Sequence, residues 1–145
     1  LGAFAEQATE GPVTAQRPAI DRLLLGERVE DVLAALDGAS AASGADAELA
    51  RAAASAMRAK SPTSLKIALA QMRRGPTLSF SECMRTEFRI VSRLMHGRDF
   101  YEGVRAVIVD KDQKPRWHPD RLEAVSAADV DAYFAPLARE LEFPC

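Results

Sequence analysis

Cysteine is scarce in this chain of 145 residues, which contains only Cys83 and Cys145. Neither stands at a metal-type spacing from the other or from His96 and His118, so the sequence predicts no metal site and no structural disulfide. No apolar run approaches the roughly 20 residues that cross a bilayer, and no basic and then apolar leader opens the chain. We therefore expect a soluble, non-exported protein without membrane contact.

A net excess of either charge is nearly absent, because 19 basic and 21 acidic residues give a net charge of only -2. Domains that bind nucleic acids usually carry a clear basic excess, so we expect no nucleic-acid partner. The charge is unevenly distributed, since residues 58–121 hold 14 basic and 7 acidic side chains while both flanking regions are acidic. Such a block is more often a solvated face, or one paired with an acidic neighbour, than a surface for an anionic ligand, and both interpretations stay open.

The strict alternation of apolar and polar residues that a half-buried strand requires is missing as well. Helical spacing, glycine, proline and capping residues occur instead, so the predicted fold class is all-α. Helices are expected over residues 18–25, 28–37, 45–60, 62–74, 80–96, 100–109, 119–125 and from 127 to about 137. Residues 110–118 contain Pro115 and precede Pro119, which predicts an irregular surface crossing.

Short polar side chains mark the expected helix starts, because their oxygen atoms accept hydrogen bonds from the first free backbone N–H groups. Ser61 stands directly before Pro62, and proline fits the first helical position. The capping-box spacing predicts three further starts, at Ser79 with Glu82, Asp99 with Glu102 and Ser126 with Asp129.

Glycines predict helix ends at Gly26, Gly38, Gly75 and Gly97, with Gly75 in the left-handed cap conformation. Pro18 is expected in the first turn of its helix, and Gly103 is expected where a neighbouring group packs closely. Helical spacing predicts the buried faces, which are Val29, Val32, Leu33 and Leu36; Leu49, Ala53 and Met57; Leu65, Leu69 and Met72; Met84, Phe88, Val91 and Met95; and Val130, Tyr133, Phe134 and Leu137.

Sequence motifs that would carry catalysis are also lacking. The chain has no Gly-rich phosphate loop, no HExxH, no CxxC pair and no GxSxG elbow. His96 and His118 are predicted to be surface or capping histidines. Asp110 and Asp112 are expected to pair with the nearby cations Lys111, Lys114 or Arg116 rather than to act as an acid and a base. We therefore assign no catalytic residue within this sequence.

Two cationic features bear on binding. Arg85, Arg89 and Arg93 repeat every four residues on one helical face, and such a stack is unfavourable unless anions face it. Acidic side chains of another domain could be the anions that face this arginine stack.

The second feature is the group of Lys111, Lys114 and Arg116 beside Trp117. Cations next to an aromatic ring suit a phosphate-bearing nucleotide through charge and stacking. The more frequent role of such a tryptophan is a lid packed over helices.

The residues also carry a family resemblance. SPTSLKIAL (61–69) and TEFRIVSRLMHGRDFYEGVRAVIVDKDQKPRWHPDRLEAVSAADVDAYF (86–134) resemble the C-terminal part of the 3-hydroxyisobutyryl-CoA hydrolases. These enzymes are a family within the crotonase (enoyl-CoA hydratase/isomerase) superfamily. The DFYEGVRA block resembles the superfamily at large, whereas the DKDQKPRWHP run resembles the hydrolases in particular.

The resemblance implies an enzyme that cleaves the thioester of a short 3-hydroxyacyl-CoA in valine breakdown, with no metal or redox cofactor and with CoA as part of the substrate. Its oxyanion hole and catalytic carboxylates would lie on a βα spiral core N-terminal to this chain. Lys111 matches the superfamily lysine that approaches the adenine or 3'-phosphate end of CoA. The resemblance also implies the bacterial cytoplasm or the mitochondrial matrix.

Within that frame, residues 1–44 are expected to be short helices and a linker joined to the core, and residues 45–145 a C-terminal helical region that covers it. The opening LGAFAEQ is typical of the end of an earlier element. The piece alone is expected to be inactive, and its uncovered apolar stripes should require the core or lead to a homo-oligomer.

Two other functions stay open. An enoyl-CoA hydratase or isomerase of the same superfamily would have a similar helical tail. A non-catalytic helical interaction module would show similar apolar helix faces and a similar arginine stripe.

Overall fold

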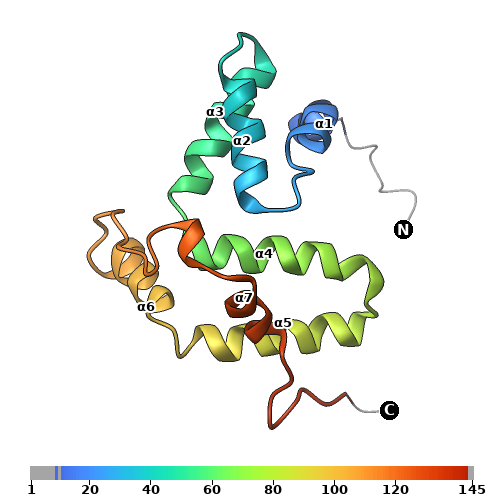
Figure 1. Cartoon of the computed structure of the whole chain (residues 1–145), viewed down its shortest axis with the longest axis vertical. Coiled ribbons are helices and arrows are strands. Elements are labelled where there is room, and N and C mark those ends of the chain that lie inside the picture. The colour runs from blue at the N-terminus through green and yellow to red at the C-terminus, as the bar shows by residue number, and fades with distance from the viewer. Residues whose placement is uncertain (1–8, 10, 144–145) are drawn as a thin grey trace. The chain divides into compact units, whose positions relative to one another are not determined.

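The computed structural model describes residue 9 and residues 11–143, and within them it contains helices and no strands (Figure 1). The predicted all-α class is therefore confirmed for the described part of the chain. Our expectations for the opening residues 1–7 and for Cys145 fall outside it. The chain divides into two compact units, residues 1–55 and residues 56–145.

The first unit contains α1 (Pro12–Leu23), α2 (Val29–Ser40) and most of α3 (Ala45–Arg58). Its core is small and rich in alanine, because short side chains let the helices approach one another. The buried residues are Ala19, Leu23, Val29, Val32, Leu36, Ala47, Ala50 and Ala54. An ion pair of 2.7 Å between Arg22 and Asp46 joins α1 to α3.

Two predicted boundaries in this unit are wrong. The first helix begins at Pro12, after an extended Gly11, so that Pro18 lies inside the helix and not in its first turn. Pro12 stands at the helix start, six residues before Pro18, and its ring fixes the helical φ there. The second helix continues through Gly38 to Ser40 because glycine weakens a helix without ending it.

The second unit is built around α4 (Pro62–Arg74), α5 (Phe80–Leu94) and α7 (Ala127–Phe134). In Figure 1, α4 and α5 run alongside each other and α7 lies between them, in contact with both. The predicted caps at Ser61, Ser79 and Ser126 are confirmed, each with its side chain accepting from the third residue of the helix. The core consists of Ile67, Ile90, Val125, Val130 and Phe134.

The segment α6 (Arg98–Val104) continues directly into a π-helical turn, Arg105–Val109. Gly97 stands at the start of α6 and does not cap α5, which ends at Leu94. The expected cap by Asp99 is wrong, because its carboxylate is engaged elsewhere, as described below.

Two further helix boundaries differ from the prediction. Gly75 is right-handed, with φ of -51°, and it begins a 3₁₀ turn over Gly75–Thr77. The helix expected over residues 119–125 is reduced to a 3₁₀ turn, Leu122–Ala124.

Some predicted inward faces also point outward. Met72 is 75% exposed, whereas its neighbour Ile67 is buried. On α5 the buried residues are Thr86 and Ile90, while Val91 and Met95 remain exposed. Packing against α7 decides which side of an amphipathic helix faces inward, and periodicity alone does not. No described helix is both long and apolar enough to span a membrane.

Candidate functional site

The predicted binding residue Lys111 lies on the loop after α6, and this loop has no regular structure between Lys111 and Arg116, as predicted. Lys111 and Gln113 both have positive φ, 55° and 57°. Residues other than glycine seldom adopt this left-handed backbone conformation, so surrounding contacts must hold the backbone there. Among the described residues, the exposed Lys111 ammonium has no hydrogen bond or ion pair.

One contact that holds the loop backbone is the hydrogen bond of 3.0 Å from the Gln113 backbone N–H to the Ala106 carbonyl. Arg105, at the first position of the π-helical turn, supplies others. Its guanidinium binds Glu102 through two hydrogen bonds of 2.8 and 3.0 Å. It also donates to Asp110 at 2.7 Å, to Asp112 at 2.8 Å and to the Lys114 carbonyl at 3.2 Å. We call this group of Glu102, Arg105, Asp110 and Asp112 the Arg105 clamp.

The clamp favours the ionised form of Glu102 and of Asp112. The hydrogen bonds from Arg105, and then the one from the Arg116 backbone N–H, lower the pKa of Glu102 to about 2. The Arg105 hydrogen bond and the Lys114 backbone N–H lower the pKa of Asp112. The hydrogen bonds that Arg105 donates to Glu102, Asp112 and Asp110 raise the pKa of Arg105 in turn.

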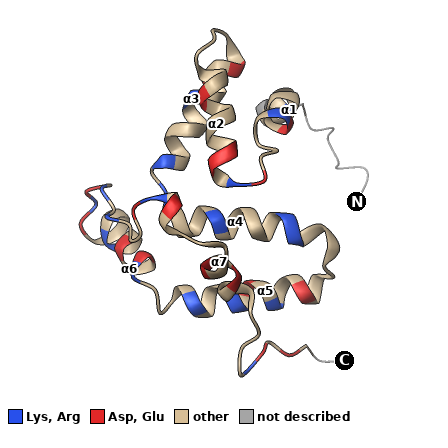
Figure 2. Cartoon of the chain, viewed as in Figure 1, with Lys and Arg blue, Asp and Glu red and all other residues tan. Residues whose placement is uncertain are grey.

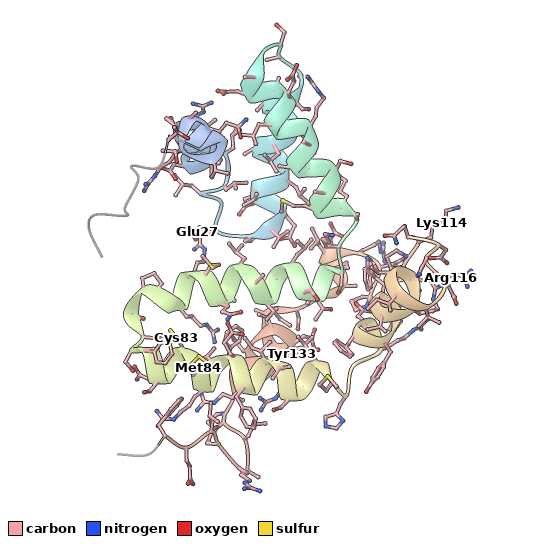
Figure 3. All side chains as sticks on the ribbon, turned by 180° about the vertical axis from the view of Figure 1, so that it is seen from behind. Glu27, Cys83, Met84, Lys114, Arg116 and Tyr133 are labelled. Atoms are coloured by element: carbon pink, nitrogen blue, oxygen red, sulfur yellow. The ribbon has the colours of Figure 1, made fainter. Side chains whose placement is uncertain are left out.

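The clamp corrects one prediction. Asp110 and Asp112 form ion pairs with Arg105, at 2.7 and 2.8 Å, and not with the lysines of the loop. Lys111, Lys114 and Arg116 are all exposed. Figure 3 shows Lys114 and Arg116 on the loop side of α6, and Figure 2 shows acidic and basic residues side by side along that loop.

Each of the three residues that end the loop is fixed to a different group. The Arg116 backbone N–H donates to Glu102 at 2.7 Å and that of His118 donates to Asp99 at 2.8 Å. Between them, the Trp117 indole N–H donates to the Ala59 carbonyl at 3.0 Å. A methyl group at Gly103 would lie 3.4 Å from the Trp117 ring, which is an ordinary contact. The ring therefore packs on α6, as predicted for a tryptophan that covers helices, but this contact does not require glycine at position 103.

Two open hollows flank α6 within the second unit. One, of about 580 Å³, has an apolar wall that includes Phe100, Val104, Ile108 and Trp117. The other, of about 620 Å³, is more polar and contains Asp99, His118, Asp129 and Tyr133. The Ser61 hydroxyl donates to Asp99 at 2.6 Å in the wall shared by both hollows.

The arginine stripe on α5 meets the end of the same chain. Residues 135–143, which we call the C-terminal strap, follow α7. Arg89 binds Glu140 at 3.0 Å and Arg93 donates to the Pro136 carbonyl, while Arg85 donates to the Leu141 carbonyl. The anions expected from another domain are therefore replaced largely by backbone carbonyls.

The remaining polar candidates form no reactive group. His96 and His118 are exposed, as predicted, and only the backbone of His118 contacts Asp99. Cys83 is a free thiol. Within the described ranges, no three His, Cys, Asp or Glu side chains gather as metal ligands.

Arg105 was missed by the sequence analysis, although a signal for it was present. Glu102 and Arg105 have the spacing of a helical ion pair, and two further aspartates follow within seven residues. Asp110 and Asp112 have lysines as immediate neighbours in the sequence, but their partner Arg105 lies five and seven residues before them. A turn of π-helix brings the guanidinium back over the loop, and that turn has no clear sequence signal.

Comparison with known proteins identifies a family. Residues 1–134 match the sequence model of the family described as Enoyl-CoA hydratase/isomerase. The mitochondrial 3-hydroxyisobutyryl-CoA hydrolase of Gallus gallus is 52% identical over 82 residues, covering 57% of this chain and 21% of the relative. The Danio rerio protein of that name is 41% identical over 124 residues, covering 84% and 30%.

Solved structures give a similar result. A carnitinyl-CoA dehydratase from Mycobacterium thermoresistibile matches with a TM-score of 0.87 and 36% identity, over 98% of this chain and 39% of that structure. An enoyl-CoA hydratase from Rhodobacter sphaeroides 2.4.1 matches with a TM-score of 0.83 and 35% identity. The chain thus spans well under half the length of these proteins.

Proposed function

Because this chain belongs to the enoyl-CoA hydratase/isomerase family, a family of CoA-dependent enzymes, we propose that it is the C-terminal part of an acyl-CoA hydrolase. Its substrate would be 3-hydroxyisobutyryl-CoA or a similar short 3-hydroxyacyl-CoA. The observation that carries the proposal is the 52% identity with a relative of that name over 82 residues. The clamped DKDQKPRWHP loop provides independent support, because it presents exposed cations suited to a phosphate-bearing substrate.

The proposal includes a catalytic core outside this chain. The chain spans only 21% and 30% of the two hydrolases described above, which leaves room for a further domain. Backbone N–H donors of that core would stabilise the oxyanion of the thioester, and a carboxylate would act on the acyl group or water. Residues 1–44 would join the core, residues 45–145 would cover it, and the chain alone would be inactive.

Lys111 is proposed to contact the adenine or 3'-phosphate end of CoA. Its ammonium is exposed and without a partner among the described residues, and Arg105 engages both carboxylates beside it. The substrate brings CoA with it, so the proposed reaction needs no metal or redox cofactor. Several curated relatives are named mitochondrial, which supports the matrix in a eukaryote, whereas a bacterial protein would be cytoplasmic.

A hydratase or isomerase of the same family is the second candidate. The two solved structures that match over 98% of the chain are a dehydratase and a hydratase, which favours this candidate.

A homo-oligomeric interaction module is the third candidate. Exposed apolar side chains on α5 and after α6, such as Val91 and Ile108, support it. Self-association of the chain without any affinity for CoA would favour this function.

The deciding experiment is a chimera in which this chain replaces the matching part of the Danio rerio relative. Release of free CoA from 3-hydroxyisobutyryl-CoA, with no hydration of an enoyl-CoA, is the expected result. Hydration without thioester cleavage would favour the second candidate. The 145-residue chain, assayed in parallel, should release no CoA, and turnover by it would refute the proposed division between core and cover.

A further inference from the structure

We propose that Arg105 is a positioning residue for CoA recognition, acting through the loop that carries Lys111. It would give the loop its shape and also neutralise the two aspartates that flank the lysine. The inference rests on the proposed function, because it assigns a role within the same CoA-binding loop. In this proposal Arg105 acts on the loop and does not itself contact CoA.

The contacts of Arg105 lie on both sides of Lys111. Arg105 reaches Asp110 on one side of Lys111 and Asp112 on the other, at 2.7 and 2.8 Å. It also holds the Lys114 carbonyl at 3.2 Å. The two residues with positive φ, Lys111 and Gln113, lie between these fixed points. An uncommon backbone conformation persists when surrounding contacts determine it. Here the guanidinium provides three of them, beside the hydrogen bond of 3.0 Å from the Gln113 backbone N–H to the Ala106 carbonyl.

Arg105 also offsets the negative charge beside Lys111. Without Arg105, the carboxylates of Asp110 and Asp112 would stand beside Lys111 and compete with a phosphate for its ammonium. With Arg105 present, both carboxylates have a cationic partner and the exposed side of the loop carries three cations. The same arginine therefore shapes the loop and makes it attractive to an anion.

The contacts also depend on the planar set of donors that a guanidinium provides. Arg105 uses the Nε, Nη1 and Nη2 atoms at once, on three carboxylates and a carbonyl. A lysine has a single ammonium on a flexible stem and cannot reproduce this planar set of donors. The position is thus specific for arginine, and Arg105→Lys should be only a partial substitute.

The experiment compares the affinities of the 145-residue chain for CoA and for 3'-dephospho-CoA, followed by NMR titration. The wild-type chain should bind CoA about fivefold more tightly, a size typical of one exposed charge contact. Arg105→Met should reduce that ratio to about one. The triple variant R105M/D110N/D112N should recover part of it, because the freed carboxylates are gone although the loop still lacks the contacts that shape it.

The ratio separates positioning from simple loss of stability. A variant that is merely destabilised loses affinity for both nucleotides equally and keeps the ratio. Arg121→Met is the matched control, since it removes an exposed arginine of the same unit that has only a 3.8 Å contact with Asp120. Its ratio should equal that of the wild type.

A ratio that Arg105→Met leaves unchanged would overturn the inference, as would a triple variant that recovers nothing. If the wild-type chain and Lys111→Met bind both nucleotides alike, the proposed role of Lys111 fails and the inference fails with it. That outcome is recognised by the wild-type measurement alone. The amide signals of Lys114 and Arg116, which both donate to carboxylates of the clamp, report in each variant whether the loop keeps its shape.

Discussion

The second unit has two groups of surface arginines, and their guanidinium groups bind different kinds of partner. Arg105 gathers three carboxylates within the eleven residues from Glu102 to Asp112. The stripe of Arg85, Arg89 and Arg93 has one carboxylate, Glu140, and otherwise meets backbone carbonyls of the C-terminal strap and of the end of α7.

The difference separates a local device from a tertiary one. The Arg105 clamp is assembled from neighbours in the chain, so it forms once α6 and its π-helical turn exist. The strap reaches α5 from about 50 residues further along the chain, and it needs the packed core of α4, α5 and α7 first. Disruption of the core should therefore release the strap, whereas local substitutions should release the clamp.

Phe134→Ala tests the dependence of the strap on the core and should have the largest effect. Phe134 is 8% exposed, its carbonyl accepts from Arg89, and its ring lies 3.8 Å from the Arg74 guanidinium. Loss of a buried aromatic ring should lower the free energy of unfolding by about 3–5 kcal/mol. Chemical denaturation measures this change. Phe80→Ala, at a residue 77% exposed, should change the value by less than about 0.5 kcal/mol, and equal losses would contradict the core assignment.

Arg89→Leu should release the strap without unfolding the unit. The carboxylate of Glu140 binds both Arg89 and the Leu137 backbone N–H, so its loss of the arginine weakens the attachment of residues 137–140. Hydrogen exchange at the Leu137 amide should accelerate by about tenfold. The Arg116 amide in the clamp should exchange at its original rate, and faster exchange at both sites would show that clamp and strap are not independent.

Lowering the pH should release the strap before it affects the Arg105 clamp. The Leu137 N–H and then Arg89 lower the pKa of Glu140 below its ordinary value of 4.5. A lowered pKa contributes stability above pH 4.5 that is lost as the pH falls through the folded-state value. Glu102, with a pKa of about 2, keeps its charge longer. Side-chain NMR titration should show Glu140 protonating before Glu102, and the reverse order would contradict this ranking.

Gly103→Ala should have the smallest effect. The added methyl group would lie 3.4 Å from the Trp117 ring, an ordinary contact, and alanine favours the helix by about 1 kcal/mol. We expect stability to change by no more than about that amount, with no loss. Gly103→Leu should instead displace the indole from the Ala59 carbonyl and shift the emission of this single tryptophan to longer wavelength. Unchanged emission in the leucine variant would show that Trp117 does not pack on Gly103.

The sequence predicted the features whose partners lie within a turn or two. The capping boxes at Ser79 and Ser126 and the proline start at Pro62 need only three or four residues, and the structure confirms all three. The packing of Trp117 over a helix was likewise predicted, although its contact with Gly103 was not. The division at residue 44 concerned a join to a core, so it stays a prediction.

The failures share a different cause. Met72, Val91 and Met95 follow the helical period but remain exposed, because α7 and the strap decide which face of α4 and α5 is covered. The partners of Asp110 and Asp112 were missed because a π-helical turn changes the direction of Arg105. Both errors concern the placement of a helix face relative to something distant or irregular, which local spacing does not encode.

The attachment of Arg116, Trp117 and His118 to three separate groups has an evolutionary consequence. Because the loop is held by Arg105 at its start and by these three anchors at its end, changes between them would not propagate into α4, α5 or α7. The side chains of Lys111 and Gln113, which lie between the points held by Arg105, are therefore free to vary without moving those helices. Related enzymes could diversify nucleotide recognition there while inheriting the helical scaffold unaltered.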